Sequence, residues 1–480
     1  MKKFLVAAAL IISAATPLTA GGLLTNTNQN AVFLRNPARD AIIGIDGVYS
    51  NPAGVAFMPQ GFHLSLSWQA AWQKRQITST APFYMLNTNA PSATREFEGK
   101  ATAPVIPSFQ AAYVINDKWS VAAQFAIGGG GGKCDFATGL PMFEQLVGGS
   151  LASGIHNAMN PTATTPYTYT LQQNLVGRQY MYGVQVGATY RVLKNLSVFA
   201  GARGVIARSG YEGAITGFTV NGIPGTMLSS KFADQAQQAA AAAKHFAEAG
   251  MADKAAEYAA LAQQAGTVAL MTQSDLTLDC SQRGFGITPI VGVDYKLGRL
   301  NLAAKYEFRT KISMENESNN SDNVDQAFAD YADGKTVRSD IPALLTVGAQ
   351  YSFAKGVRTM AGFHYFFDKG AKGAATNVDK NTWEVTAGVE WDITDKFMVS
   401  LGAQRTQYGF DDKGMTDTNF NISSTGLCLG ASYRVNQMVN INAGYMHSFY
   451  DEHEINRGNG ITDLYTRKND VIGVSVDLTF

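Results

Sequence analysis

Histidine, cysteine and grouped acidic residues carry most protein chemistry, and in this chain they are scattered. The six histidines show neither metal-ligand spacing nor a neighbouring nucleophile motif: His63, His156, His245, His364, His447 and His453. The three cysteines, Cys134, Cys280 and Cys428, are far apart and odd in number. We predict isolated thiols, with a Cys134–Cys280 bridge as the alternative in an oxidising compartment. The pattern predicts no enzyme, no cofactor and no metal.

The charge balance points to no charged partner. The 38 basic residues equal the 38 acidic ones, so no strong field favours nucleic acid. Charged residues make up only 16% of the chain, whereas glycine (48 residues) and aromatic residues (11%) are plentiful. This composition is typical of a β protein with an apolar exterior.

The N-terminus predicts the compartment. Lys2 and Lys3 precede an apolar run that ends at Ile12, and small residues lead from there to Ala20. This is the pattern of a secretory signal peptide over residues 1–20, and its apolar run is too short to span a bilayer. No later run of 18 apolar residues predicts a transmembrane helix.

A strand ending with one aromatic residue recurs six times, each time before a short polar or glycine turn. The aromatic residues are Tyr113, Tyr190, Tyr295, Tyr351, Trp391 and Tyr433. Two positions before each stands Ala or Val, and one position before stand mostly polar residues: Ala112, Thr189, Asp294, Gln350, Glu390 and Ser432. Because successive strand residues face opposite sides, the pattern predicts an apolar outside, a polar inside and an aromatic girdle. A soluble sandwich or propeller is the alternative.

We therefore predict an all-β fold, a fourteen-stranded antiparallel transmembrane barrel over residues 61–480. The even strand number and the alternation of short turns with long loops follow the rule for bacterial outer-membrane barrels. The expected strands are 61–76, 99–115, 118–128, 176–193, 196–212, 277–296, 300–315, 335–354, 357–368, 380–393, 396–409, 422–435, 438–450 and 467–480.

Two long outer loops are expected, at 129–175 and 213–276. The first contains "PMFEQLVGGSLASG", which predicts a short helix. The second contains the Ala-rich stretch 231–266, which predicts a helical hairpin broken at Gly250. Its apolar residues Phe232, Phe246, Tyr258 and Leu261 are expected to pack on the rim.

Residues 21–60 do not alternate, although many are apolar. Outside a barrel such a segment would be a liability, so we predict that it forms a plug inside. The tripeptide Asn-Pro-Ala occurs twice here, at 36–38 and 51–53. Proline fixes φ and asparagine can bond its own backbone, so both are expected to be turns.

The stretch "DGVYSNPAGVAFMPQGFHLSLS" resembles the N-terminal signature of the FadL-type family, whose members carry long-chain fatty acids and other hydrophobic compounds. The resemblance implies a fourteen-stranded barrel with an N-terminal hatch and large outer loops. It assigns a gating role to Asn51, Pro52, Ala53 and Phe57, and leaves 36–38 as a structural corner.

The stretch "LSVFAGARGVIARSGYEG" resembles the family strand whose arginine holds the fatty-acid carboxylate, which places that role on Arg208. The alternatives are an arginine paired with lumen carboxylates or one pointing to lipopolysaccharide at the outer rim. Arg309 and Lys311 are the nearest candidates for the family's second cationic contact.

The family route implies sideways exit through a gap at a kink in the third strand. Here that strand runs into glycines, and Gly128, Gly129 and Gly130 are the expected kink. A flexible start to the following loop is the alternative. The final "VIGVSVDLTF" resembles the terminal-strand signal for the barrel assembly machinery, which assigns Phe480 to that signal.

These features together predict a monomeric barrel, embedded in outer-membrane lipid of a Gram-negative bacterium, for passive uptake of a hydrophobic small molecule. Long-chain fatty acids come first, and aromatic hydrocarbons or other lipids second. A diffusion porin, an adhesin and a barrel lipase or protease are the alternatives from other classes.

Overall fold

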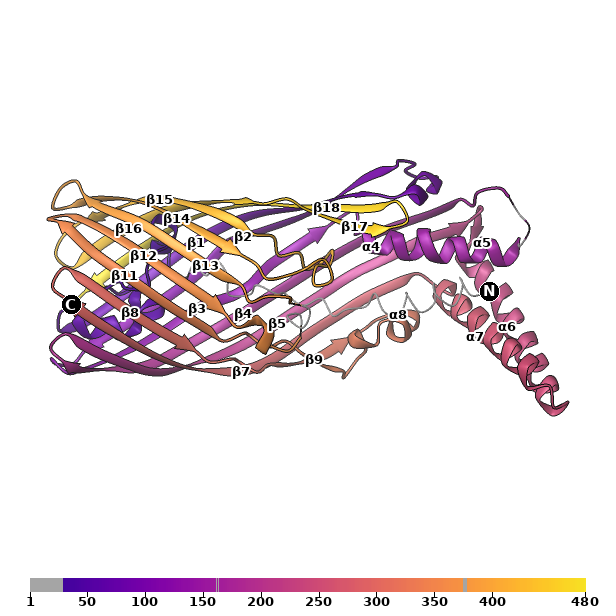
Figure 1. Ribbon diagram of the computed structural model, residues 1–480, viewed down its shortest axis with the longest axis horizontal. Coiled ribbons are helices and arrows are strands. Elements are labelled where there is room, and N and C mark those ends of the chain that lie inside the picture. Colours follow the sequence, from indigo (N-terminus) through magenta and orange to yellow (C-terminus); the bar gives the residue numbers. More distant parts are fainter. Residues whose placement is uncertain (1–28, 161, 163, 374–377) are drawn as a thin grey trace.

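The computed structural model describes residues 29–160, 162, 164–373 and 378–480. The expected signal peptide (1–20) and residues 21–28 of the expected plug therefore lie outside the described residues. One sheet curves round and closes on itself, with helices at one end and a few short helices inside (Figure 1). Within the described ranges, no helix is long and apolar enough to cross a membrane.

Fourteen antiparallel strands form the wall in the described part of the chain, as the alternation predicted. The last strand pairs with the first from His63 opposite Thr479 onward, which closes the barrel. The strands are β1 (Gly61–Thr80), β2 (Thr94–Val114), β3 (Trp119–Phe136), β4 (Tyr169–Leu193), β5 (Leu196–Val220), β7 (Leu276–Leu297), β8 (Leu300–Glu307), β11 (Leu344–Ala354), β12 (Val357–Phe366), β13 (Trp383–Asp392), β14 (Phe397–Gln407), β15 (Ser424–Arg434), β16 (Val439–Tyr450) and β18 (Ile461–Thr479).

Short extra strands lengthen the wall at the long-loop end: β6 (Ile223–Pro224), β9 (Ser313–Ser318), β10 (Thr336–Arg338) and β17 (His453–Gly458). β9 continues the line of β8, and β10 that of β11. Both lines break at the same level, where Thr310 and Ile341 form a bridge between them.

The two faces of the wall are those predicted. Five of the six girdle aromatics are exposed on the outside, and the sixth, Tyr190, lies 4.7 Å from the ring of Trp119. Their inward neighbours Thr189, Asp294 and Glu390 are buried. The apolar exterior includes Val184, Val186, Ile206, Phe285, Ile287, Val291, Val293, Leu401 and Leu429. An apolar belt bounded by aromatic residues is the exterior of a transmembrane barrel.

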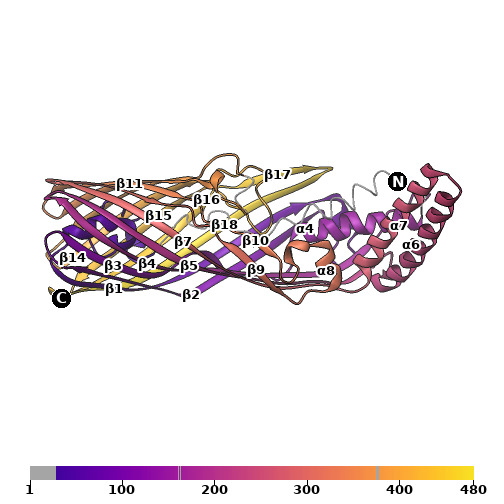
Figure 2. The ribbon, with the colours of Figure 1, turned by 90° about the horizontal axis from the view of Figure 1, so that it is seen from below.

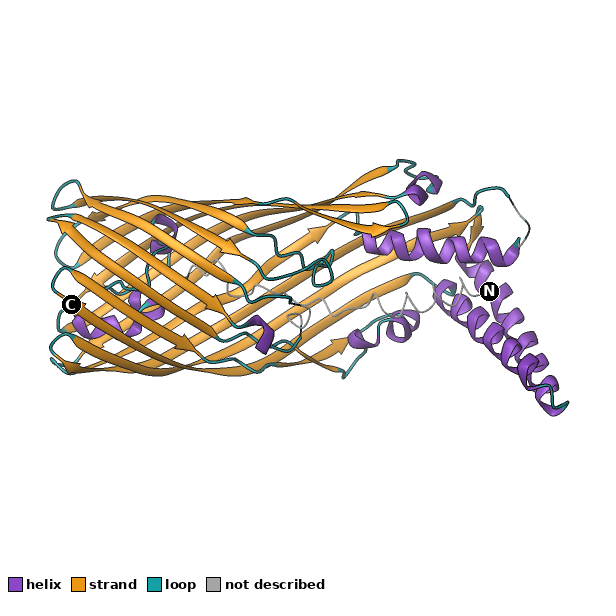
Figure 3. Ribbon diagram, in the orientation of Figure 1, coloured by secondary structure: helices purple, strands orange, loops and turns teal. Residues whose placement is uncertain are grey.

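The C-terminus lies at the end with short turns, and the long loops with their helices project from the other end (Figures 1 and 3). The loop helices are η2 (Pro82–Leu86), α4 (Pro141–Glu144), the π-helix η3 (Gln145–Ala152), α5 (Ser153–Met159), α6 (Gly225–Glu248), α7 (Ala252–Thr272), α8 (Asp322–Ala327), η4 (Ala329–Tyr331) and η5 (Asp368–Gly370).

The two expected long loops begin later than predicted. β3 continues through its glycines to Phe136 and β5 reaches Val220, so neither residue 129 nor residue 213 starts a loop. The two predicted helical regions are confirmed, as α4 to α5 and as the α6–α7 hairpin turning at Gly250.

An apolar core joins these helices to the strand ends. Phe232 is buried in it, beside Leu228 and Val268. The expected packing on the rim is wrong for Phe246 and Tyr258, whose rings stack on each other 5.2 Å apart within the hairpin. Figure 2 shows this hairpin bent away at the far end of the barrel.

The plug occupies the short-turn end of the barrel. Its helices are α2 (Val32–Arg35), α3 (Gly47–Ser50) and η1 (Pro52–Phe57). They pack against the inner faces of β15, β16 and β18 on one side and of β3, β4, β5 and β7 on the other. The lumen is therefore filled at this end and lined by loops and helices at the other.

Candidate functional site

Both Asn-Pro-Ala stretches make the turns that their residue types predicted. The Asn36 side chain accepts a hydrogen bond from the Ala38 N–H at 3.1 Å, and Asn51 accepts one from the Gly54 N–H at 3.3 Å. Both asparagines are buried. Each turn thus satisfies a backbone donor that has no strand partner.

The second stretch is tied more firmly to the wall. Asn51 donates to the Ile42 carbonyl at 3.0 Å and to Asp294 on β7 at 2.5 Å. Thr189 and Ser197 donate to the carbonyls of Pro52 and Ala53. Phe57 lies under the guanidinium of Arg191, 4.9 Å from its ring centroid. These contacts fix the segment, and its gating role stays a prediction.

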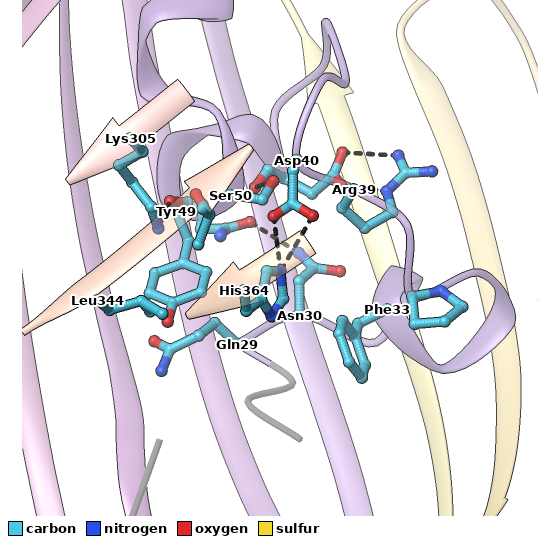
Figure 4. A pocket seen from close by; sticks show the side chains of 14 residues that line it. Gln29, Asn30, Phe33, Arg39, Asp40, Tyr49, Ser50, Lys305, Leu344 and His364 are labelled. Atoms are coloured by element: carbon cyan, nitrogen blue, oxygen red, sulfur yellow. Dashed lines mark hydrogen bonds and ion pairs between the residues drawn. The ribbon is translucent and has the colours of Figure 1, made fainter. Parts of the chain in front are cut away.

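A buried charge network holds the rest of the plug. Arg35 and Arg39 both donate to one oxygen of Glu390, at 2.6 and 2.7 Å, and Arg39 also pairs with Asp46. His364 lies between Asp40 and Glu384, at 2.9 Å from each. Figure 4 shows Asp40 meeting His364, with Arg39 close by.

The hollow beside this network is too small for a lipid. It measures about 40 Å³ and is bordered by Gln29, Tyr49, Lys305 and His364, among others. A water molecule needs roughly 10–15 Å³ on the same measure, so the hollow has room for only a few waters. This layer of the plug is therefore polar and closely packed.

The wall has an opening in its hydrogen-bond ladder between β2 and β3. The two strands pair from Val114 to Ser108 and again from Ala101 to Gly99, and not between. β2 carries Pro104 and Pro107 in this stretch, neither of which has an N–H to donate. Each proline removes one donor from β2, and the stretch that holds both is the one that β3 leaves unpaired.

β3 is irregular at the same level. Its pairing with β4 shifts at Gly129 and again before Gly132. Gly130 and Gly132 have φ of 101° and 66°, which side-chain-bearing residues rarely adopt. β3 is thus irregular at Gly128 to Gly130 and continues to Phe136, so no loop starts here, and a ligand exit at these glycines stays a prediction.

The plug reaches this gap through its first described residues. Gln29 accepts a hydrogen bond from Gln124 on β3 at 2.6 Å, and Asn30 donates to Gln110 on β2 at 2.8 Å. A Cβ placed on Gly128 would lie 3.3 Å from the Gln29 amide nitrogen. That nitrogen is buried and has no hydrogen-bond partner among the described residues. Gln29 therefore stands at the inner side of the gap.

Arg208 does not face the lumen, so its predicted role as a carboxylate ligand in an apolar cavity is wrong. Its side chain is exposed on the outside of β5, two residues from the exposed Ile206. The buried neighbours Ala207 and Ser209 point inward instead. The resemblance matched a motif, and the alternation of the strand decides the face.

Arg309 and Lys311 do not join a lumen site either. Arg309 donates to the Gly370 carbonyl and lies 3.9 Å from Asp340, in the break between β8 and β9. Lys311 is exposed. The lumen cations of this region are Arg203 and Lys305, which are both buried and lie 2.7 Å from Glu307.

Two other arginines face the lumen and pair with no carboxylate among the described residues. Arg75 on β1 and Arg467 on β18 lie directly opposite each other in register. They share the inner face of the wall with Ile77 and Tyr465, two residues away on the same strands and both fully buried. Arg75 donates to the Gln73 side chain and the Thr418 carbonyl, and Arg467 to the Phe420 carbonyl. We call Arg75 and Arg467 the lumen arginine pair.

Aromatic residues surround the lumen arginine pair. The Arg75 guanidinium lies 5.8 Å from the Phe420 ring centroid, and that of Arg467 lies 4.7 Å from the Tyr450 centroid. Phe420 belongs to an apolar cluster of the outer lumen with Tyr84, Phe97, Phe136, Leu140 and Met415. The Nε of Arg467 is buried and makes no hydrogen bond with the described residues.

This arrangement is suited to an anion with an apolar tail. Like charges directly opposite across two strands destabilise a sheet, and buried charges without a counter-ion are costly. A carboxylate bound between the two guanidiniums would offset the repulsion between them and would accept a hydrogen bond from the Arg467 Nε–H. Sequence alternation on β1 and β18 placed both residues inward, but their proximity depends on barrel closure.

The remaining reactive residues do not assemble a site. All three cysteines are free, so the alternative bridge between Cys134 and Cys280 does not form in this structure. Across the described residues, no group of three or more His, Cys, Asp or Glu side chains is arranged to hold a metal ion. Phe480 is exposed and lies 6.1 Å from the Phe62 ring, and its part in assembly stays a prediction.

No protein-family model and no curated protein matches this chain. Solved barrels do. A Pseudomonas aeruginosa FadL homologue is 13% identical, covers 96% of this chain and 100% of its own, and has a TM-score of 0.62. The P. putida toluene transporter TodX is 14% identical, with 91% and 94% covered and a TM-score of 0.53. The Ralstonia pickettii toluene transporter TbuX is 15% identical, with 93% and 98% covered and a TM-score of 0.50. The chain thus has the FadL-type fold that the resemblance predicted.

Proposed function

We propose that this barrel takes up hydrophobic carboxylates, long-chain fatty acids first, passively across the outer membrane of a Gram-negative bacterium. The observation that carries the proposal is the lumen arginine pair without a counter-ion. It lies on the outer side of the only stretch where β2 and β3, as described, fail to pair. One ligand can therefore bind the arginine pair with its charged head group while its tail reaches the lateral exit.

The distances along the wall support this pairing of site and exit. Arg75 lies four residues from Ala71 along β1, toward the long-loop end of the barrel. Ala71 lies opposite Ala103, which is in the gap. At about 3.3 Å per residue this is roughly 13 Å along β1. A fatty acid held by its carboxylate at the arginines therefore has its acyl chain at the level of the gap.

The route needs no energy source. A ligand enters among the apolar outer loops, binds at the lumen arginine pair and leaves sideways between β2 and β3 into the membrane. The plug packed against the wall at the short-turn end disfavours the alternative of an open diffusion porin, because a porin needs a water-filled pore. Gln29, at the inner side of the gap, is the plug residue that a leaving ligand meets.

An uncharged aromatic hydrocarbon is the second candidate. Two of the similar structures are toluene transporters. An apolar cluster also lies on the inner wall around Met181, Val205, Ile312 and Met314. A hydrocarbon would use this cluster and leave the arginine pair unused, so removing the arginines separates the two ligand classes.

The test is binding of a long-chain fatty acid and of its alcohol analogue to the purified barrel carrying Arg75→Gln and Arg467→Gln. A hydrogen bond to a charged group contributes about 1.5–3 kcal/mol, so we expect the acid to bind at least tenfold more weakly. The alcohol should change less than about twofold. Arg405→Gln is the matched control, since Arg405 is an arginine paired with Asp451.

Two results would contradict the carboxylate site: equal losses for acid and alcohol, or no loss for the acid. Arg208→Ala should leave both affinities unchanged, because its side chain is outside the barrel. Mass spectrometry of lipids that co-purify with the protein would identify the natural ligand.

A further inference from the structure

Three arginines gather on the outer surface of the wall, at the end with the long loops. Arg178 is on β4, Arg208 on β5 and Arg283 on β7, which are neighbouring strands. Together with Tyr180 and Glu317 they border a hollow of about 300 Å³. We call these three residues the outer arginine patch. None of them faces the lumen.

Carboxylates stand beside the patch, but among the described residues they leave one of its arginines without an ion pair. Arg208 and Arg283 lie directly opposite each other in register. Arg208 forms no ion pair with a described carboxylate, whereas Arg178 pairs with Glu212 at 2.9 Å and Arg283 with Glu315 at 3.5 Å. The side chains of both pairs are 42–58% exposed, and such surface pairs contribute little. Like charges in direct register are stabilised by an anion between them.

The depth of the patch is that of lipid phosphate groups. On β7 the exterior is apolar from Tyr295 to Phe285, and Arg283 is the next outward-facing residue. Ten residues at about 3.3 Å, on a strand tilted by about 40°, span roughly 25 Å, which is the height of the apolar band of an outer-membrane barrel. Arg208 follows Ile206 on β5 at the same level.

Aromatic residues mark the same boundary on β4. The ring centroids of Tyr180 and Tyr182 lie 6.0 Å apart, and both residues follow Arg178 along β4 toward the middle of the membrane. Tyrosine is favoured where one end of the side chain meets hydrocarbon and the other meets water. From the middle of the membrane outward, the wall is first apolar, then carries the two tyrosines and then the arginines. This order matches the acyl chains, the interface and the head groups of the lipids.

We propose that the outer arginine patch binds the phosphate groups of a phosphorylated glycolipid of the outer leaflet, of the lipid A type. Guanidinium groups form bidentate contacts with phosphate, and the free Arg208 supplies one without breaking an existing ion pair. A lipid fits better than a soluble anion because Ile206 and Phe285, just below the patch, offer acyl chains an apolar surface. The site lies on the outside and is independent of the proposed uptake.

The experiment is native mass spectrometry of the full-length barrel in detergent with added diphosphoryl lipid A. Arg208→Gln with Arg283→Gln is the test variant, and Arg405→Gln, another paired arginine, is the control. An arginine near an anionic membrane surface contributes about 1 kcal/mol, so we expect lipid occupancy to fall about fivefold per arginine removed. Heat-dependent migration in SDS gels confirms that each variant is folded, and Arg208→Gln alone is measured as well.

Three outcomes decide the proposal. Weaker binding of diphosphoryl lipid A by the test variant, with unchanged weak binding of a dephosphorylated lipid A, supports it. Equal binding by wild type and test variant overturns it. Displacement of the lipid by inorganic phosphate at equal concentration also overturns it, because the patch would then be a general anion site. Uptake of fatty acid should stay at the wild-type rate throughout, so failure here leaves the proposed function standing.

Discussion

A disulfide across the gap between β2 and β3 should stop the passage of ligand and leave the barrel folded. A Cβ built on Gly132 of β3 lies 3.8 Å from the Cβ of Ala103 on β2. Native disulfides have a mean Cβ–Cβ separation of about 3.8 Å. The variant is therefore Ala103→Cys with Gly132→Cys, made with Cys134→Ser because Cys134 lies opposite Ala101 in the same ladder.

The energetic effect of this bridge follows from the structure. It closes a loop of about 30 residues, for which the chain-entropy model gives roughly 3.5 kcal/mol of stabilisation. Placing a side chain at Gly132, where φ is 66°, costs about 1–2 kcal/mol. The oxidised variant should therefore be about 3.5 kcal/mol more stable than the reduced variant, and about 2 kcal/mol more stable than the barrel that keeps Gly132.

The assay compares uptake of a radiolabelled fatty acid by cells or proteoliposomes before and after reduction of the bridge. We expect the oxidised variant to transport at least tenfold more slowly, since the unpaired stretch can no longer widen, and to recover on reduction. The single variant Ala103→Cys controls for the substitution itself. Transport by the fully oxidised variant at the wild-type rate would refute lateral exit at this gap.

Three further outcomes are expected. Glu390→Gln leaves Arg35 and Arg39 buried beside a neutral amide, so a denaturant titration should show a free energy of unfolding lower by about 3–5 kcal/mol. Asp392 forms a more exposed pair with Arg358, so Asp392→Asn should lower it by less than about 1 kcal/mol in the same titration. Asn51→Ala should destabilise the barrel by about 2–4 kcal/mol and change the rate of uptake, because Asn51 also bonds Asp294 and Ile42. Asn36→Ala should destabilise it by about 1–2 kcal/mol and leave the rate of uptake unchanged. Equal effects of the two variants on uptake would count against a gate at 51–53. Burial, with the charge of Asp463, raises the pKa of the loop residue Asp417 to about 6, against the hydrogen bonds that it accepts from Met142 and Tyr465. The packing of the loop around Asp417 should therefore be most stable below about pH 4 and lose stability as the pH rises through 6, because a buried charge then forms. Limited proteolysis of the outer loops should show this, and Asp417→Asn should abolish it.

The fold could be predicted because barrel strands repeat a pattern with a period of two residues. The turn aromatics and their polar neighbours gave fourteen strands and both faces, since each strand carries its own signal. The strand ends were less predictable. β1, for example, continues to Thr80 with polar residues on both sides, because beyond the membrane no apolar face is needed.

The functional residues were harder to predict because they depend on pairing between distant segments. Arg75 and Arg467 are almost 400 residues apart in the chain and become neighbours only when β18 closes on β1. The glycines of β3 were visible in the sequence, but Pro104 and Pro107 gain their meaning from lying opposite them. Arg208 shows the reverse error, since a motif match was given more weight than the alternation that places it outside.

The contacts of the plug decide how a ligand can leave. Removing the whole plug would break the ion pairs of Arg35 and Arg39 with Glu390 and the bond from Asn51 to Asp294. It would also break the bonds that wall side chains donate to plug carbonyls, from Gln185, Thr189, Ser197, Asn301 and Lys305. At about 0.5–1.5 kcal/mol for a neutral hydrogen bond and more for a charged one, the total is on the order of 10 kcal/mol.

Exit through the wall breaks far fewer bonds. β2 and β3 share no ladder hydrogen bonds between Ala101 and Ser108, so widening this stretch removes none. The described plug residues that must yield are Gln29 and Asn30, which hold the neighbouring strands through Gln124, Gln110 and Ser65. Three such bonds amount to about 2–4 kcal/mol, which thermal motion overcomes readily. Moving Gln29 and Asn30 therefore costs less free energy than moving the whole plug, which favours sideways release over passage through the plug.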